Sequence, residues 1–249
     1  MPVFQLYDAP VFPHPDLAEE DGLLALGGDL SVPRLLQAYA WTVFPWYSEE
    51  TPLLWWSPDP RLVLFCDEFH MPRSLRRTLN KGEFRLSVDQ SFEQIIQGCA
   101  RAKRPEGEGT WLTPEMIDAY SELHRQGHAH CVATWQGEEL VGGIYGVALG
   151  RIFYGESMFY SVPNASKAAL VALVQVLRER GFTAMDCQQT TAHMLRFGAR
   201  EIPRGQLLHL VQKGLEETRV QGSPWGGEGL LRWVPSRRQF RPEEGWRER

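Results

Sequence analysis

An aspartate and a glutamine two positions apart, Asp186 and Gln188, are the residues whose types and spacing could most directly do chemistry. They end an expected strand over 182–188 in which Phe182 and Ala184 share their face, because alternate side chains of a strand point the same way. A carboxylate and an amide that emerge together from an apolar strand end are a candidate catalytic pair. The competing interpretation is a pair that caps a neighbouring helix or loop.

A second carboxylate, Glu156, lies in the otherwise apolar stretch 152–160. An ionised carboxylate inside a sheet is costly unless it is paired or hydrogen-bonded. Strand alternation places Glu156 and Met158 on one face. The pattern therefore predicts a functional carboxylate or, equally, a structural ion pair or an edge residue.

Tryptophans spread through the N-terminal half could bind a nucleobase: Trp46, Trp55, Trp56 and Trp111. Stacking of a base on an aromatic ring is worth about 1–3 kcal/mol. Packing in the core is the commoner use of a tryptophan, so stacking is the functional alternative for any one of them.

Metal, nucleotide and thiol chemistry lack the residues that they would need. His128 and His130 share a strand face, but no third ligand accompanies them, so no metal site is expected. The chain has no Walker loop, no GxGxxG turn that opens a helix and no GxSxG elbow. Its four cysteines form no CxxC pair and have no evident activating partner. Reduced, mostly buried thiols in a cytoplasmic protein are expected.

The whole-chain composition limits the partners. The chain has 249 residues, of which 43% are hydrophobic and 23% charged, enough for a sizeable core in one large or two unequal domains. No apolar run reaches the roughly 18 residues of a membrane span, and no signal peptide is expected. The net charge of −5 disfavours a broad nucleic-acid surface, although basic residues cluster between Arg73 and Arg85. That cluster predicts either a solvated face or contact with a small part of a nucleic acid, such as an end.

These residues must be positioned by a mixed α/β (α+β) fold. Proline-rich residues 1–60 predict a small N-terminal lobe with one short helix near 32–39, and residues from about 237 predict a polar tail. Between them, strand and helix periodicities predict strands at 61–66, 130–135, 139–147, 152–160 and 182–188 and helices at 91–102, 114–126 and 165–180. The last helix is apolar almost all round, so it should be buried on most sides. The order of strands and helix indicates a sheet with an antiparallel part.

Short segments along residues 10–205 give the chain a specific resemblance to the leucyl/phenylalanyl-tRNA–protein transferases. The first half contributes Gly22-Leu-Leu-Ala-Leu-Gly-Gly-Asp-Leu-Ser31, Phe44-Pro-Trp46, Trp55-Trp-Ser-Pro-Asp-Pro-Arg61, Gly109-Thr-Trp111 and Gly127-His-Ala-His130. The second half contributes Leu140-Val-Gly-Gly143, Tyr145-Gly-Val147, Gly155-Glu-Ser-Met-Phe159, Asn164-Ala-Ser-Lys167, Asp186-Cys-Gln188, Phe197-Gly-Ala199 and Ile202-Pro-Arg204.

The resemblance implies a small N-terminal domain (1–60), a GNAT-like (acetyltransferase-like) catalytic domain (61–236) and the tail (237–249). It implies transfer of leucine, phenylalanine or, less efficiently, methionine from aminoacyl-tRNA to proteins that start with Arg or Lys, which marks them for degradation in the N-end rule pathway. It implies no metal, no cofactor and a monomer.

The resemblance also assigns site residues. Catalysis falls on Asp186 and Gln188, with Asp186 acting through Gln188 as the proton-accepting system and Glu156 in support. Met158 and Ile144 match the wall of the aminoacyl pocket, where Ile144 departs from the methionine of some members. Further matches are Trp46 and Trp111, which would sandwich the 3′-terminal adenine, and Arg76, Arg77 and Lys81, which are candidate tRNA phosphate contacts. Thr42 and Val43 depart from the usual Gly-Ile, which concerns the loop geometry and not the reaction.

Two other classes compete with this interpretation. An acetyl-CoA-dependent acetyltransferase would need a glycine-containing phosphate turn at a helix start, and the helix that begins at Asn164-Ala-Ser-Lys167 lacks one. A non-catalytic module that binds tRNA ends or N-terminal Arg would not need the polar set Asp186, Gln188 and Glu156.

Overall fold

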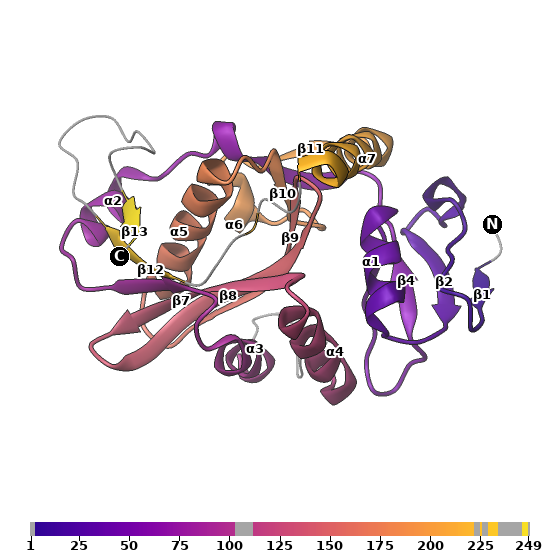
Figure 1. The fold of residues 1–249 in the computed structure, drawn as a ribbon, viewed down its shortest axis with the longest axis horizontal. Coiled ribbons are helices and arrows are strands. Elements are labelled where there is room, and N and C mark those ends of the chain that lie inside the picture. The colour runs from indigo at the N-terminus through magenta and orange to yellow at the C-terminus, as the bar shows by residue number, and fades with distance from the viewer. Residues whose placement is uncertain (1–2, 103–111, 222–224, 226–228, 234–245, 249) are drawn as a thin grey trace.

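The computed structural model describes residues 3–102, 112–221, 225, 229–233 and 246–248, which form two sheets surrounded by helices (Figure 1). The fold class predicted from the sequence, mixed α/β, is confirmed. The elements are β1 (Phe4–Leu6), β2 (Leu23–Gly27), α1 (Val32–Ala40), β3 (Phe44–Pro45), β4 (Leu54–Trp56), β5 (Arg61–Phe65), α2 (Arg73–Leu79), β6 (Arg85–Val88), α3 (Phe92–Arg101), α4 (Pro114–Arg125), β7 (Ala129–Gln136), β8 (Glu139–Leu149), β9 (Ile152–Tyr160), α5 (Ala165–Glu179), β10 (Ala184–Asp186), α6 (Ala192–Leu195), β11 (Arg200–Ile202), α7 (Arg204–Gln221), β12 (Gly229–Trp233) and β13 (Trp246–Glu248), with 3₁₀ turns at Pro15–Leu17 and Cys66–Glu68.

The N-terminal sheet has four strands in the order β1-β2-β4-β3, with α1 packed beside it (Figure 1). Arg34 of α1 is completely buried and donates to the main-chain oxygens of Tyr7 and Ala9 and to the Asp29 carboxylate. Gly28 must be glycine, because its φ is +76° and a Cβ there would lie 2.9 Å from the Arg34 guanidinium carbon. Arg34 thus joins the N-terminal segment to the helix.

The larger sheet has nine strands in the order β11-β5-β10-β9-β8-β7-β6-β12-β13. Strands β6, β7, β8 and β9 pair in this order, each antiparallel to the next, whereas β9 and β10 are parallel and are connected through α5. Figure 1 shows α5 on one face of this sheet and α3 and α4 on the other. The predicted burial of α5 on most sides is confirmed, since its residues from Ala168 to Leu177 are all buried.

One expectation for the C-terminal part was wrong in its bounds. The strand expected over 182–188 comprises only Ala184–Asp186. Helix α7, which the sequence pattern did not predict, runs through Gly214, which faces the chain at Arg151; a Cβ on Gly214 would lie 2.7 Å from the Arg151 nitrogen. Most of the expected tail lies outside the described residues, and within it Trp246–Glu248 pair with β12.

A β-bulge interrupts the pairing of β8 with β9. Tyr145 pairs with Ser157 and Gly146 with Gly155, so Glu156 is the extra residue of β9. Before the bulge Phe153 packs with α5, and after it Met158 does, which is one position out of step with simple alternation. Glu156 instead reaches the opposite layer. The expectation that Glu156 and Met158 share a face was wrong, because the bulge reverses the alternation.

Gly146 allows this bulge. A Cβ on Gly146 would lie 2.0 Å from the main-chain oxygen of Tyr154. We expect Gly146→Ala to lower the free energy of unfolding by about 3 kcal/mol, because a backbone atom must move to accept the methyl group. Urea denaturation would measure this loss. The control is Gly205→Ala in α7, where a Cβ meets nothing within 4 Å, and a helical alanine there should stabilise by about 0.5–1 kcal/mol. Equal stability of the two variants would contradict the prediction.

Candidate active site

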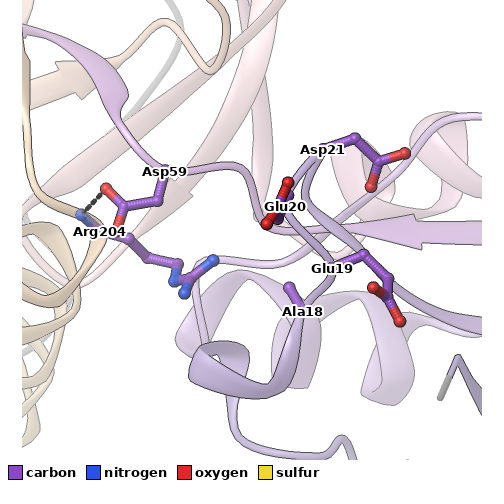
Figure 2. Close-up of a pocket in the computed structure, with 6 residues that line it drawn as sticks. All are labelled: Ala18, Glu19, Glu20, Asp21, Asp59 and Arg204. Carbon is purple, nitrogen blue, oxygen red and sulfur yellow. Dashed lines mark hydrogen bonds between the residues drawn. The ribbon is translucent and has the colours of Figure 1, made fainter. Parts of the chain in front are cut away.

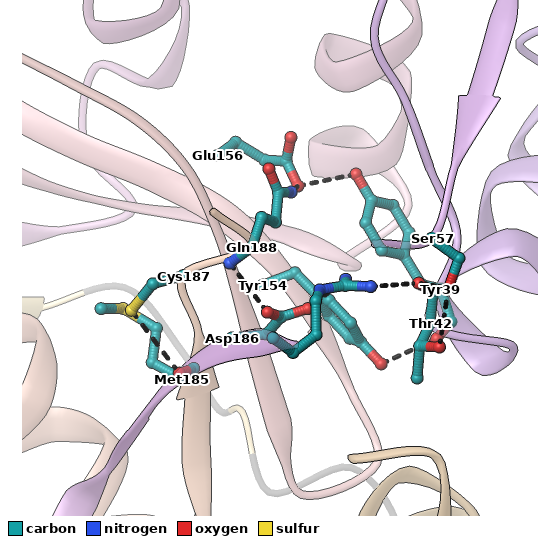
Figure 3. Close-up of polar contacts among 10 residues, drawn as sticks. Tyr39, Thr42, Ser57, Tyr154, Glu156, Met185, Asp186, Cys187 and Gln188 are labelled. Carbon is teal, nitrogen blue, oxygen red and sulfur yellow. Dashed lines mark hydrogen bonds and ion pairs between the residues drawn. The ribbon is translucent and has the colours of Figure 1, made fainter. Parts of the chain in front are cut away.

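The candidate site lies where β9 and β10 diverge. The two strands pair only over Ile152–Tyr154 and Ala184–Asp186, so the chain beyond each, at Glu156 and Gln188, is released from the ladder. Gln188 has a φ of +62°, in the left-handed region, and therefore does not continue the strand. The predicted shared strand face of Asp186 and Gln188 was wrong, yet Figure 3 shows both residues in one polar cluster with Glu156.

Asp186 is completely buried and holds two partners. One oxygen pairs with the Arg61 guanidinium at 2.6 Å, and the other accepts the main-chain N–H of Gln188 at 2.8 Å. The second bond supports the left-handed conformation that turns Gln188 away from the strand direction. Arg61, also fully buried, donates in addition to the main-chain oxygen of Thr42 at 2.6 Å. The pair therefore connects the site to the N-terminal lobe.

Glu156 is surrounded by three donors. The hydroxyls of Tyr39 and Tyr120 approach its two oxygens at 2.8 and 3.1 Å. The Gln188 side-chain nitrogen donates to it at 3.0 Å, and Figure 3 shows Tyr39 and Gln188 beside Glu156. The two tyrosine oxygens are also 2.6 Å apart. Two hydroxyl protons cannot satisfy all three contacts among Tyr39, Tyr120 and Glu156, whereas a protonated carboxyl supplies the third.

Electrostatics agrees with this proton count. Burial raises the pKa of Glu156 to about 7, against the lowering effect of the two tyrosine hydrogen bonds. Burial and the nearby Glu156 charge raise the pKa of Tyr39 well above its usual value, and the same two causes act on Tyr120. The tyrosines therefore remain hydroxyl donors at neutral pH, while Glu156 changes its charge there.

An apolar cavity of about 420 Å³ opens beside the polar cluster. Its wall includes Glu156, the sequence-predicted Ile144 and Met158, and two further methionines, Met185 and Met194. A cavity of this size and lining suits a small apolar group with few polar contacts. The structure thus brings together Glu156, Ile144 and Met158, and hydrogen bonds join Gln188 and Asp186 to this set.

Of the remaining predicted site residues, those that the structure describes lie outside this cavity wall. Trp46 is 42% exposed and stands edge-on to Trp56 at 5.7 Å between ring centroids. Trp111 lies outside the described residues. Arg76 is half-buried on α2, while Arg77 and Lys81 are exposed.

Sequence reasoning missed Arg61, Tyr39 and Tyr120. Tyr39 belonged to an expected apolar stripe of a short helix, and Tyr120 to a helix with no sign of function. Their partner Glu156 is 117 and 36 residues away in sequence, so no local spacing announces the contacts. The only available signal was the cost of burying the Glu156 carboxylate, which requires donors from elsewhere.

A separate hollow of about 780 Å³ lies between the N-terminal lobe and α7, bordered by Asp59, Arg204 and the acidic residues Glu19 to Asp21 (Figure 2). The Asp59 carboxylate accepts the main-chain N–H of Arg204, and the Arg204 side chain donates to Ser57 and Asp16. These bonds tie two parts of the fold together, so the hollow is a structural junction.

A titratable carboxyl in the wall of an apolar cavity, hydrogen-bonded to an amide where two parallel strands diverge, suits an α/β enzyme that acts on a group with an apolar side chain. The chain matches the family model described as leucyl/phenylalanyl-tRNA protein transferase over residues 63–212, and the model of that family's N-terminal domain over 28–59. It belongs to the leucyl/phenylalanyl-tRNA–protein transferase family.

Similar proteins support this assignment at nearly full length. The leucyl/phenylalanyl-tRNA–protein transferase of Anaeromyxobacter sp. (strain K) is 54% identical over 231 residues, which are 92% of this chain and 99% of that protein. The enzyme of the same name from Syntrophobacter fumaroxidans is 54% identical over 228 residues, 92% of this chain and 97% of that protein. Among solved structures, an aminoglycoside acetyltransferase from an uncultured soil metagenomic sample matches with a TM-score of 0.33 at 12% identity, covering 65% of this chain and 99% of that one.

Proposed function

We propose that this transferase moves leucine or phenylalanine, and methionine less efficiently, from aminoacyl-tRNA to the N-terminal Arg or Lys of acceptor proteins. The single observation that supports it best is the apolar cavity with Glu156 in its wall and Gln188 hydrogen-bonded to that carboxyl. Ile144 and Met158 would contact the side chain of the transferred residue. The modification would mark acceptors for degradation in the N-end rule pathway, carried out by a cytoplasmic monomer of one small N-terminal domain (1–60) and one catalytic domain (61–236).

The chemistry asks for positioning and for removal of one proton. An aminoacyl ester is already activated, so holding the acceptor amine against it supplies much of the rate enhancement without a cofactor. The amine attacks the ester carbonyl carbon, the ester oxygen of the tRNA leaves, and the ammonium proton must be lost. The Gln188 side chain gives its N–H to Glu156, which leaves its carbonyl oxygen to accept a hydrogen bond from the amine.

Asp186 contributes indirectly, by positioning Gln188. It is completely buried, so it acts on the substrates through Gln188, whose main-chain N–H it accepts. Glu156, with a pKa raised to about 7 by burial, can hold a proton or release it near neutral pH and orients the Gln188 amide. Its negative form would also favour the cationic N-terminal residue of the acceptor.

The tRNA end would be held by aromatic and basic residues. The exposed Trp46 ring can stack on the terminal adenine together with Trp111. Arg76, Arg77 and Lys81, on and just after α2, can contact phosphates near that end. Binding limited to the end of the RNA agrees with the overall charge of −5.

The test uses purified protein, labelled Leu-tRNA and two peptides that differ only in an N-terminal Arg or Ala. Label should move to the Arg peptide and leave the Ala peptide unlabelled. An Arg peptide with an acetylated N-terminus is the control, because it keeps the side chain and removes the nucleophile. Absence of transfer to either free peptide, from both Leu-tRNA and Phe-tRNA, would refute the proposed function.

A further inference from the structure

A second, smaller hollow of about 240 Å³ lies among α2, α5 and the chain around α6. Three of its lining residues have basic side chains: Lys167 on α5, His193 on α6 and Arg196 directly after α6. Ser74, Thr78 and Asn164 add hydroxyl and amide groups. Among the described residues, none that lines it is an aspartate or a glutamate.

Among the described residues, no carboxylate pairs with the charged groups of this hollow. The Lys167 ammonium donates to the Asn164 side-chain oxygen at 3.2 Å, and neither Lys167 nor Arg196 forms an ion pair within the described part of the chain. The His193 Nε2 is buried without a hydrogen-bond partner. Burial, and then the nearby Lys167 and Arg196 charges, lower the pKa of His193. Converging bases without an acid are an arrangement that an anion stabilises.

The start of α5 adds to the positive potential. Asn164 precedes the helix with a φ of +71°, and its side chain makes no capping hydrogen bond. The first amides of a helix carry partial positive charge, which favours an anion at this end. Three elements thus supply positive charge or donors to one small hollow.

The hollow adjoins the apolar cavity, because His193 lines both. We propose that the hollow of Lys167, His193 and Arg196 binds a backbone phosphate of the donor RNA, close to its aminoacylated end. The inference rests on the proposed function: an RNA whose aminoacyl group occupies the apolar cavity would place its nearby phosphodiester backbone within reach of the adjoining basic hollow. The contact carries no sequence information and fixes the register of the RNA end.

The experiment compares the wild type with the Lys167→Ala/Arg196→Ala variant on two donors, Phe-tRNA and 3′-phenylalanyl-adenosine, which lacks every phosphate. We expect the KM for Phe-tRNA to rise about tenfold or more, with kcat nearly unchanged, because charged hydrogen bonds to one phosphate are lost. The slope of log affinity against log salt should fall by about 0.7 for each lost phosphate contact of single-stranded RNA. Transfer from phenylalanyl-adenosine should remain at the wild-type rate.

A matched control is Lys213→Ala, which removes an exposed lysine of α7 that does not line the hollow and should change neither KM nor slope. An unchanged KM and slope for Phe-tRNA in the double variant would overturn the proposal. Equal loss with phenylalanyl-adenosine would also overturn it, since the residues would then shape the aminoacyl cavity itself.

Binding of an uncharged RNA oligonucleotide ending in CCA, followed by fluorescence anisotropy, separates this proposal from the transfer reaction. Weaker binding by the double variant supports the phosphate site even if the wild type transfers nothing, which would refute only the proposed function. Coenzyme A is the third arm. If it binds the wild type but not the variant, while both bind the RNA equally, the hollow serves a nucleotide coenzyme and the proposal is wrong.

Discussion

Asp186→Asn should lower the free energy of unfolding by about 3–5 kcal/mol and the rate of transfer by at least about a hundredfold. The stability loss follows from Arg61, which is completely buried and would keep its charge without a carboxylate beside it. The rate loss follows from Gln188, because its left-handed backbone is held by the same carboxylate, and small displacements of a positioned group are costly in catalysis. Urea denaturation and Leu-tRNA transfer to an Arg peptide measure the two effects.

A second variant separates the two roles of Asp186. Arg61→Met combined with Asp186→Leu removes both buried charges and keeps the volume apolar, so most of the stability should return. Transfer should stay lost, because leucine cannot accept the Gln188 main-chain N–H. An Asp186→Asn protein with wild-type stability would show that the buried guanidinium finds another partner. A folded Asp186→Asn protein with full transfer would remove Asp186 from the mechanism.

The sequence sufficed for the elements whose hydrophobic pattern is local. The helix α5 is apolar almost all round, and β8 and β9 are largely apolar strands joined by a turn at Gly150 and Arg151. The motifs around Glu156 and Asp186 sufficed to select the cluster that the structure brings together. Helix α7 was not predicted from the sequence; within it Gly214 packs so closely on Arg151 that a Cβ would lie 2.7 Å from the main-chain nitrogen.

The orientation of the site could not be predicted, because it depends on two departures from regular strands. The bulge at Glu156 turns the side chain toward Tyr39 and Tyr120, and strand alternation alone would have left it beside Met158. The left-handed conformation of Gln188 is stabilised by a local hydrogen bond, which its main-chain N–H donates to the Asp186 carboxylate two residues earlier. Such departures cost free energy locally and are retained where the surrounding contacts hold them, commonly at functional sites.

The same departures give Glu156 a charge state that responds to neutral pH. The bulge brings the carboxyl among buried groups, and burial raises its pKa from 4.5 to about 7. A carboxyl whose pKa is raised on folding contributes stability that is fully present below pH 4.5 and is lost as the pH rises through about 7. The fold favours the neutral form of Glu156. Forming the charged form near neutral pH, where a proton acceptor would be useful for transfer, therefore lowers the free energy of unfolding.

The difference in free energy of unfolding between Glu156→Gln and the wild type should therefore change with pH, in favour of the variant as the pH rises. Glutamine stays neutral, so between pH 4 and pH 8 the stability of the variant should improve relative to the wild type by about 3 kcal/mol. Urea denaturation of both proteins across this range measures the difference, and Glu138→Gln in the exposed turn between β7 and β8 is the control for loss of a surface carboxylate. A difference that stays constant with pH would mean that Glu156 is ionised throughout.

The same variant tests the role of this charge in transfer. If the ionised form of Glu156 orients Gln188 and attracts the acceptor, kcat/KM of the wild type rises through pH about 7, and Glu156→Gln loses that step and is slower at pH 8. The α-amine of the peptide also titrates, near pH 7.7–8.0 in model peptides, so one peptide must serve both proteins and only the difference between their profiles is informative. Parallel profiles would assign the whole pH dependence to the acceptor amine and leave Glu156 the structural task of holding Tyr39, Tyr120 and Gln188 in place.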